Sequence, residues 1–87
     1  MPYIDQKAKD KLFNELETQL PLYIGTPGEL NFLMTELCKV YVANNKLNYQ
    51  TINDIVGALE GCKLEFYRRV GAPYEDLKIN QNGDVYL

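Results

Sequence analysis

The sequence predicts a mainly α-helical protein: a three-helix domain built on an antiparallel helical hairpin, followed by a short C-terminal β-hairpin or extended tail. Three observations support this prediction. Apolar residues recur every three or four positions through three segments, a residue that caps helices well precedes each segment, and the end of the chain carries a hairpin-turn signal. The 87 residues are enough for one domain with a thin core, so we expect a single helical domain over residues 1–87.

The first helix is expected over about residues 5–20, because Asp5 is a good N-cap and Pro21 cannot continue a helix. Its apolar stripe repeats every fourth residue: Ala8, Leu12, Leu16 and Leu20.

The second helix is expected over residues 27–43. Thr26, Pro27 and Glu29 form a capping box with the favoured first-turn proline, and Asn44-Asn45 is a plausible left-handed stop. The face expected to be buried carries Leu30, Leu33, Met34, Leu37, Cys38 and Tyr41, widened by Phe32 and Val40.

The third helix is expected over residues 50–70. Thr51 with Asp54 forms one capping box, Asn48 is the rival cap, and Gly71 and Pro73 are expected to end the helix. The predicted buried stripe is Ile52, Ile55, Val56, Leu59, Cys62, Phe66 and Val70.

Two glycines, Gly57 and Gly61, stand four residues apart inside this third helix. Each costs about 0.5–1 kcal/mol relative to alanine, so a close approach of another backbone is expected to offset the loss. The approaching backbone is either the second helix or a second copy of the third, and a ligand near the backbone is the alternative.

The tail, residues 74–87, changes character. Asn82-Gly83 is a strong hairpin-turn signal with short β-type stretches on either side. An isolated hairpin is marginal in water, so this tail is expected to pack on the helices, pair with another chain or stay frayed.

Composition excludes several function classes. The chain has no histidine, and Cys38 and Cys62 lack paired metal-ligand spacing, so we expect two buried free thiols, no metal, no cofactor and no catalytic set. The net charge of −3 argues against non-specific nucleic-acid binding, and no apolar run is long enough for a membrane span. The first residues do not resemble a signal peptide, so the cytoplasm of a bacterial host is the expected location. A thin core without disulfides favours a homo-oligomer.

The candidate ligand-binding residues are Arg68, Arg69, Tyr67, Tyr74 and Tyr86. The guanidinium groups suit a phosphate and the tyrosine rings suit stacking on a base. The competing interpretation is structural: the arginines complement the negative end of the helix dipole, with Glu75 and Asp76 as partners, and the tyrosines form an amphipathic rim. Five tyrosines fit such a rim: Tyr3, Tyr23, Tyr49, Tyr74 and Tyr86.

The segments 48–57, 63–70, 72–76 and 82–86 together resemble a small family of uncharacterised proteins found in phages and bacteria. The resemblance implies a phage or prophage setting and no particular activity. A second likeness is an analogy: Arg68-Arg69-Val70-Gly71-Ala72-Pro73 is similar to the arginine-ended long helix of phage anti-defence sponges, which are helical oligomers that sequester nucleotide-derived immune signals.

Three hypotheses for function follow, and all are non-catalytic. The first is a sponge for a small nucleotide-derived signal, the second a protein–protein interaction module or inhibitor of a host protein, and the third a small structural or assembly protein.

Overall fold

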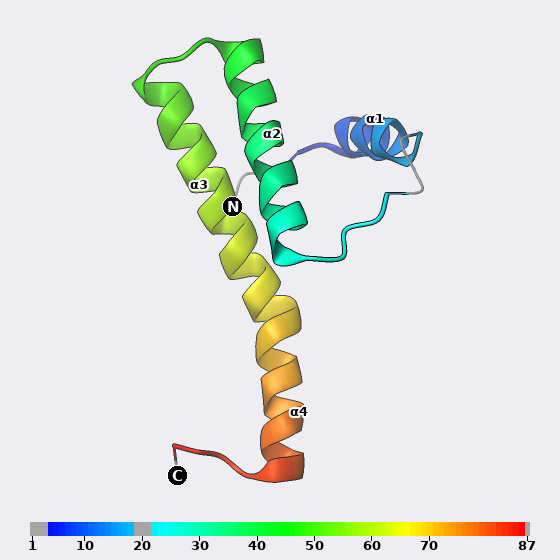
Figure 1. Ribbon diagram of the computed structural model, residues 1–87, viewed down its shortest axis with the longest axis vertical. Helices are drawn as coiled ribbons and strands as arrows, with labels where there is room; N and C mark the ends of the chain where they lie inside the picture. The colour runs from blue at the N-terminus through cyan, green and yellow to red at the C-terminus, as the bar shows by residue number, and fades with distance from the viewer. Residues whose placement is uncertain (1–3, 19–21, 87) are drawn as a thin grey trace. The chain divides into compact units, whose positions relative to one another are not determined.

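A computed structural model describes residues 4–18 and 22–86 of the chain, and 81% of these residues are helical. The elements in chain order are α1 (Gln6–Glu17), α2 (Pro27–Asn45), α3 (Tyr49–Phe66), the π-helical turn η1 (Tyr67–Gly71) and α4 (Ala72–Asn82) (Figure 1). The prediction of a mainly α protein is confirmed, and the described residues contain no strand.

Contacts divide the chain into two compact units, Met1–Ile55 and Val56–Leu87. The first unit holds α1, α2 and the first turns of α3. The second unit holds the rest of α3, η1 and α4.

Helix α1 begins as predicted, because the side chain of Asp5 accepts a hydrogen bond from the Ala8 amide at 2.8 Å. The helix ends at Glu17, with Thr18 as its C-cap. The predicted end at residue 20 lies in residues 19–21, outside the described residues.

Helix α2 begins at the predicted cap. The Glu29 amide donates to Thr26 Oγ1 at 3.1 Å, and the Glu29 carboxylate accepts from the Gly25 amide at 2.9 Å. The helix runs two residues past the predicted end, because the Asn45 side chain donates back to the Tyr41 carbonyl instead of leaving the helix. Lys46, with φ 75°, ends it.

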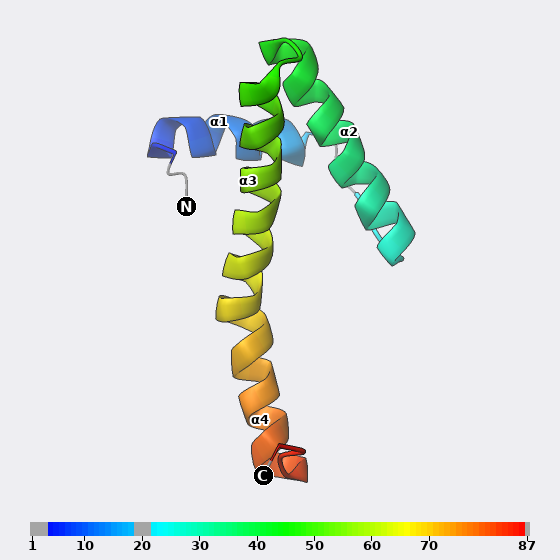
Figure 2. The same cartoon turned by 90° about the vertical axis from the view of Figure 1, so that its left-hand side faces the viewer.

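The turn between α2 and α3 reverses the chain (Figure 2). Asn48, the rival cap, begins α3: its side chain accepts from the Thr51 amide at 2.9 Å. The Thr51 hydroxyl donates to the Lys46 carbonyl at 2.7 Å, and Thr51 is 3% exposed. Tyr41 on α2 donates to Asp54 on α3 at 2.9 Å. These bonds join the end of α2 to the start of α3.

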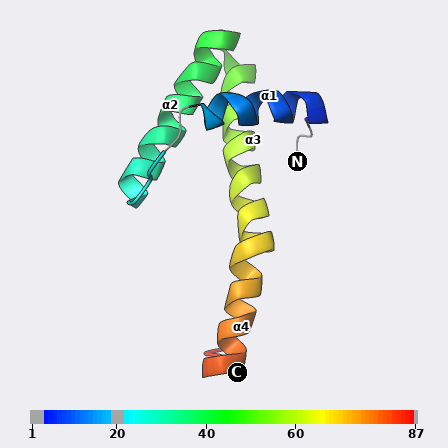
Figure 3. The ribbon, with the colours of Figure 1, turned by 90° about the vertical axis from the view of Figure 1, so that its right-hand side faces the viewer.

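The predicted helix end at residue 70 and the predicted C-terminal β-hairpin are both wrong. Helix α3 passes through η1 into α4 without a break (Figure 3). The Ala72 amide bonds the Tyr67 carbonyl, five residues back, and this wider turn accommodates Pro73, which has no N–H and lies in the first turn of α4. Asn82-Gly83 ends α4, with Gly83 at φ 89°, instead of forming a hairpin turn.

The apolar faces are present, but they are not buried. Thr51 is the only buried residue among those described, and no apolar side chain is buried with it. Leu37 is 68% exposed and Phe66 63%, although both lie on faces predicted to be buried. The cysteines are free as predicted, yet Cys38 is half-buried and Cys62 exposed. Periodicity identifies the apolar face of a helix and says nothing of what covers it.

Candidate functional site

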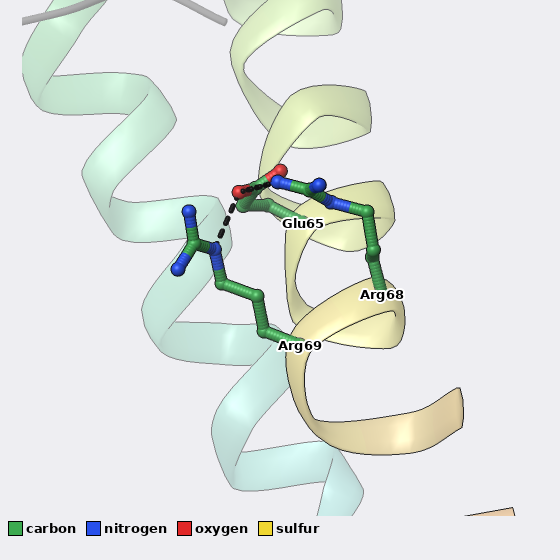
Figure 4. Close-up of polar contacts among 3 residues, drawn as sticks. All are labelled: Glu65, Arg68 and Arg69. Carbon is green, nitrogen blue, oxygen red and sulfur yellow. Dashed lines mark hydrogen bonds and ion pairs between the residues drawn. The ribbon is translucent and has the colours of Figure 1, made fainter. Parts of the chain in front are cut away.

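Two arginines share one carboxylate where α3 enters η1 (Figure 4). Arg68 Nη2 donates to Glu65 Oε1 at 2.8 Å, and Arg69 Nε donates to the same oxygen at 2.6 Å. The three side chains meet because residues three and four apart lie on one side of a helix. We call these three residues the Arg–Glu cluster.

The Arg–Glu cluster carries an excess of positive charge. The hydrogen bonds from Arg68 and Arg69 lower the pKa of Glu65 to about 2, so its carboxylate stays ionised above that pH. Both arginine side chains are 70% exposed, whereas Glu65 is 26% exposed. One negative charge therefore faces two guanidinium groups, each with further N–H donors open to water.

The structural interpretation of the arginines as helix caps is wrong. They lie inside a continuous helical run that ends at Asn82, so no helix C-terminus is near them. Glu75 is not their partner either, because it accepts a hydrogen bond from the Tyr67 hydroxyl at 2.7 Å. That bond raises the pKa of Tyr67, with smaller contributions from burial and from the charges of Glu75 and Asp76.

The structure does not gather the three candidate tyrosines around the arginines. The Tyr67 ring lies over Gly71, where an added Cβ would come within 2.8 Å of it. Tyr74, on α4, holds the Lys78 ammonium 5.5 Å from its ring centre. Tyr86 lies beyond α4 and is 93% exposed. Of the other tyrosines predicted to form a rim, Tyr23 and Tyr49 are exposed and Tyr3 lies outside the described residues.

Gly57 and Gly61 face open space. Apart from the adjoining backbone of its own helix, a Cβ built on either would meet no atom within 4 Å. The close crossing predicted from their spacing, with the second helix or with a second copy of the third, stays a prediction, as does the alternative of a ligand near the backbone.

A shallow hollow of about 370 Å³ lies at the start of α2. Apolar side chains of Leu22, Phe32 and Leu33 line it, together with Tyr23 and Glu29. Sequence reasoning missed this hollow, because it depends on the path of the linker that precedes α2.

Two hydrogen bonds were also missed by sequence reasoning. The Tyr67–Glu75 bond requires the helix to continue past Pro73, and the Tyr41–Asp54 bond requires the fold of the α2–α3 turn. The Glu65–Arg68 and Glu65–Arg69 pairs, by contrast, are visible as spacings of three and four in the sequence.

In the part of the chain that the structure describes, no three acidic, cysteine or histidine side chains are grouped to hold a metal ion. None of the described helices is long and apolar enough to cross a bilayer.

The fold and the Arg–Glu cluster define a small helical protein with exposed apolar faces and a positively charged helical turn. The chain belongs to the family described as a domain of unknown function, DUF6899, whose model matches residues 1–85. Neither a curated protein nor a solved structure matches it.

Proposed function

We propose that this chain is a non-catalytic protein–protein interaction module whose helices bury their apolar faces only on association. The observation that carries the proposal is the exposure of most large apolar side chains of the described helices, none of which is buried. Burying one such side chain is worth about 1.5–3 kcal/mol, so association has a large favourable term available.

The internal hydrogen bonds support the same proposal. The chain is well capped at Asp5, Thr26 and Asn48, so its helices are specified locally. Local specification gives helical segments, but isolated helices are marginal in water without a packed face. A partner that covers those faces therefore supplies the tertiary part of the stability.

The test is the thermal midpoint of the helical signal at chain concentrations from about 1 to 100 μM, alone and with each purified candidate partner. Because a partner that binds only the folded state raises the midpoint, we expect the midpoint to rise with concentration or with added partner. A sharp melt at a constant midpoint under all these conditions, with no binding of an apolar dye, contradicts the proposal.

A second candidate function is the sequestration of a small phosphate-bearing nucleotide signal, in a phage or prophage setting. The observation that favours it is the Arg–Glu cluster, in which the guanidinium groups of Arg68 and Arg69 bond the same oxygen of Glu65 and both side chains are 70% exposed. Guanidinium groups match phosphate oxygens in charge and geometry. Tyr74 and Tyr86 carry exposed rings that suit stacking on a base.

Native mass spectrometry of the protein purified from cells that make a nucleotide-based defence signal tests this second function. A bound mass equal to a cyclic nucleotide or an ADP-ribose derivative, lost in the Arg68→Ala/Arg69→Ala variant, supports it. Lys63→Ala is the matched control, because Lys63 is an exposed cation outside the Arg–Glu cluster. A clean protein mass in all three samples contradicts it.

A further inference from the structure

An apolar stripe follows one side of the second unit through α3, η1 and α4. Its members are spaced by three and four residues: Leu59, Cys62, Phe66, Val70, Tyr74 and Leu77. A regular α-helix would let the run from Phe66 to Tyr74 drift around the helix, but η1 has more residues per turn and brings these side chains back into line. All six side chains are exposed.

We propose that this apolar stripe docks a second copy of the chain in antiparallel orientation, forming a two-fold symmetric dimer. This inference rests on the proposed interaction function and names the partner. The partner is a second copy of the chain because two antiparallel stripes fit each other. Apolar residues then face apolar residues, and acidic side chains along the edge face basic ones.

The apolar residues of the stripe are arranged symmetrically about one position in the sequence. Phe66 and Val70 stand at equal distances along the chain on the two sides of Arg68, and so do Leu59 and Leu77. In an antiparallel two-fold pair, residues placed equally about the axis face each other across the interface. Phe66 then meets the partner's Val70, and Leu59 meets the partner's Leu77.

Four charged residues are arranged symmetrically about a position one residue further along the sequence. Glu60 and Lys78 stand at equal distances on the two sides of Arg69, and so do Lys63 and Glu75. In the antiparallel pair each acidic residue therefore faces a basic one, which a parallel pair would not achieve. Opposite charges in facing positions select one orientation of a helix pair.

The four charged residues already make contacts within the chain, and one of these contacts is with a stripe residue. Lys63 and Glu60 lie 3.8 Å apart on the same side of α3. The Lys78 ammonium lies over the ring of Tyr74, a stripe residue, and Glu75 bonds Tyr67. All four charged side chains are exposed, so they are free to exchange these contacts for contacts with a second copy.

The two glycines of α3 lie on the other side of the helix. At 100° per residue, Gly57 stands opposite Phe66, and Gly61 is turned away from both Leu59 and Phe66. They therefore provide a control surface on the same element, where a Cβ meets open space.

Sedimentation equilibrium of the full chain tests the proposed dimer. We expect a monomer–dimer equilibrium, weakened at least tenfold by Phe66→Glu and by Val70→Glu and left unchanged by Gly61→Ala. Phe66 is already exposed, so Phe66→Ala gives a milder variant whose helix content, measured by circular dichroism, confirms that folding is intact.

A charge exchange tests the antiparallel orientation. Lys78→Glu places like charges opposite each other at both ends of the interface, and we expect about tenfold weaker association. Glu60→Lys in the same chain restores opposite charges, so the double variant should regain the wild-type dimer constant.

Three results overturn the inference: a monomer at every concentration, a dimer indifferent to the stripe substitutions, or a double variant weaker than Lys78→Glu. A monomer whose stripe is nonetheless protected from hydrogen exchange would mean that the same chain covers it. The proposed interaction function survives any of these results if an added protein raises the thermal midpoint, so the two failures are distinguishable.

Discussion

Lys46 holds a backbone conformation that suits glycine. Its φ of 75° and ψ of 144° lie in a region that costs a residue with a side chain about 1–3 kcal/mol. The conformation persists because its amide donates to the Val42 carbonyl at 2.8 Å and its carbonyl accepts from the Thr51 hydroxyl at 2.7 Å. These two bonds join the end of α2 to the start of α3, so the strain is localised at the turn.

The substitution Lys46→Gly should therefore stabilise the protein. Relief of the strain, less the conformational entropy that glycine loses on folding, gives an expected gain of about 0.5–1 kcal/mol in the free energy of unfolding. Urea unfolding followed by circular dichroism measures it. Lys46→Ala is the matched control and should gain nothing, because alanine keeps the side-chain clash. A destabilised Lys46→Gly protein would show that the positive φ is absent in solution.

Glu65 should titrate far below an ordinary glutamate. Its folded pKa of about 2 lies below the ordinary 4.5, because Arg68 and Arg69 both donate to its carboxylate. A lowered folded pKa contributes stability that is complete above the unfolded pKa and is lost as the pH falls from about 4.5 towards 2. The ion pairs of the Arg–Glu cluster therefore weaken only in that acid window.

Carbon-detected NMR titration of the Glu65 carboxyl checks this expectation. The pKa should rise towards 4.5 in the Arg68→Gln/Arg69→Gln variant. Lys11→Gln is the control, since Lys11 pairs with Glu15 on α1. A wild-type Glu65 that titrates near 4.5 would mean that the two arginines do not hold it in solution.

At the scale of the element, Tyr67 spans the π-helical turn. Its ring covers Gly71, its hydroxyl reaches Glu75, and its carbonyl accepts the Ala72 amide. An alanine at position 71 would put its Cβ within 2.8 Å of the ring, and the ring is anchored by the bond to Glu75. Gly71→Ala must therefore displace Tyr67 or distort η1.

Two glycine substitutions in one helical run should consequently have opposite effects. Gly71→Ala should lower the thermal midpoint and bring the raised pKa of Tyr67 back down, because the bond to Glu75 is lost. Gly57→Ala, whose Cβ would meet nothing within 4 Å beyond the adjoining backbone of its own helix, should gain about 0.5–1 kcal/mol from helix propensity. Ultraviolet titration, with Tyr67→Phe to identify the Tyr67 signal, measures the pKa. Equal effects of the two substitutions would argue against the Tyr67 contact.

The elements were predictable where the signal is local. Asp5 and Thr26 begin their helices through side-chain bonds to nearby amides, and such bonds depend on a few adjacent residues. The predictions made from Pro73 and from Asn82-Gly83 were wrong, because each motif occurs in two kinds of local structure. A π-turn admits the proline into a continuous helix, and the same Asn-Gly pair that forms a hairpin turn also ends a helix.

The candidate site was likewise predictable only where its contacts are local. The spacing of Glu65 from Arg68 and Arg69 holds in any helix, so the sequence predicts that pairing. The role of Tyr67 could not be predicted, because its partner Glu75 comes within reach only when η1 carries the helix past Pro73. The exposure of the two arginines could not be predicted either, since a periodic pattern identifies the apolar side of a helix but not what packs against the helix.

At the scale of the whole molecule, exposed apolar surface has a calorimetric consequence. Unfolding raises the heat capacity mainly by exposing buried apolar groups, by about 12–15 cal/mol/K per residue in compact domains. For the 87 residues of this chain, that rule gives about 1.0–1.3 kcal/mol/K. The described residues bury no apolar side chain, so the isolated chain has less such surface left to expose than a compact domain of its length.

We therefore expect the heat capacity of unfolding to fall well below 1.0 kcal/mol/K at low chain concentration and to approach that value as the chain associates. Differential scanning calorimetry over a concentration series measures it. Phe66→Glu, which is designed to prevent pairing through the stripe, should keep the low value at every concentration. A full heat capacity in the dilute wild-type chain would mean that its apolar faces are covered without a partner, because only buried apolar surface produces that signal.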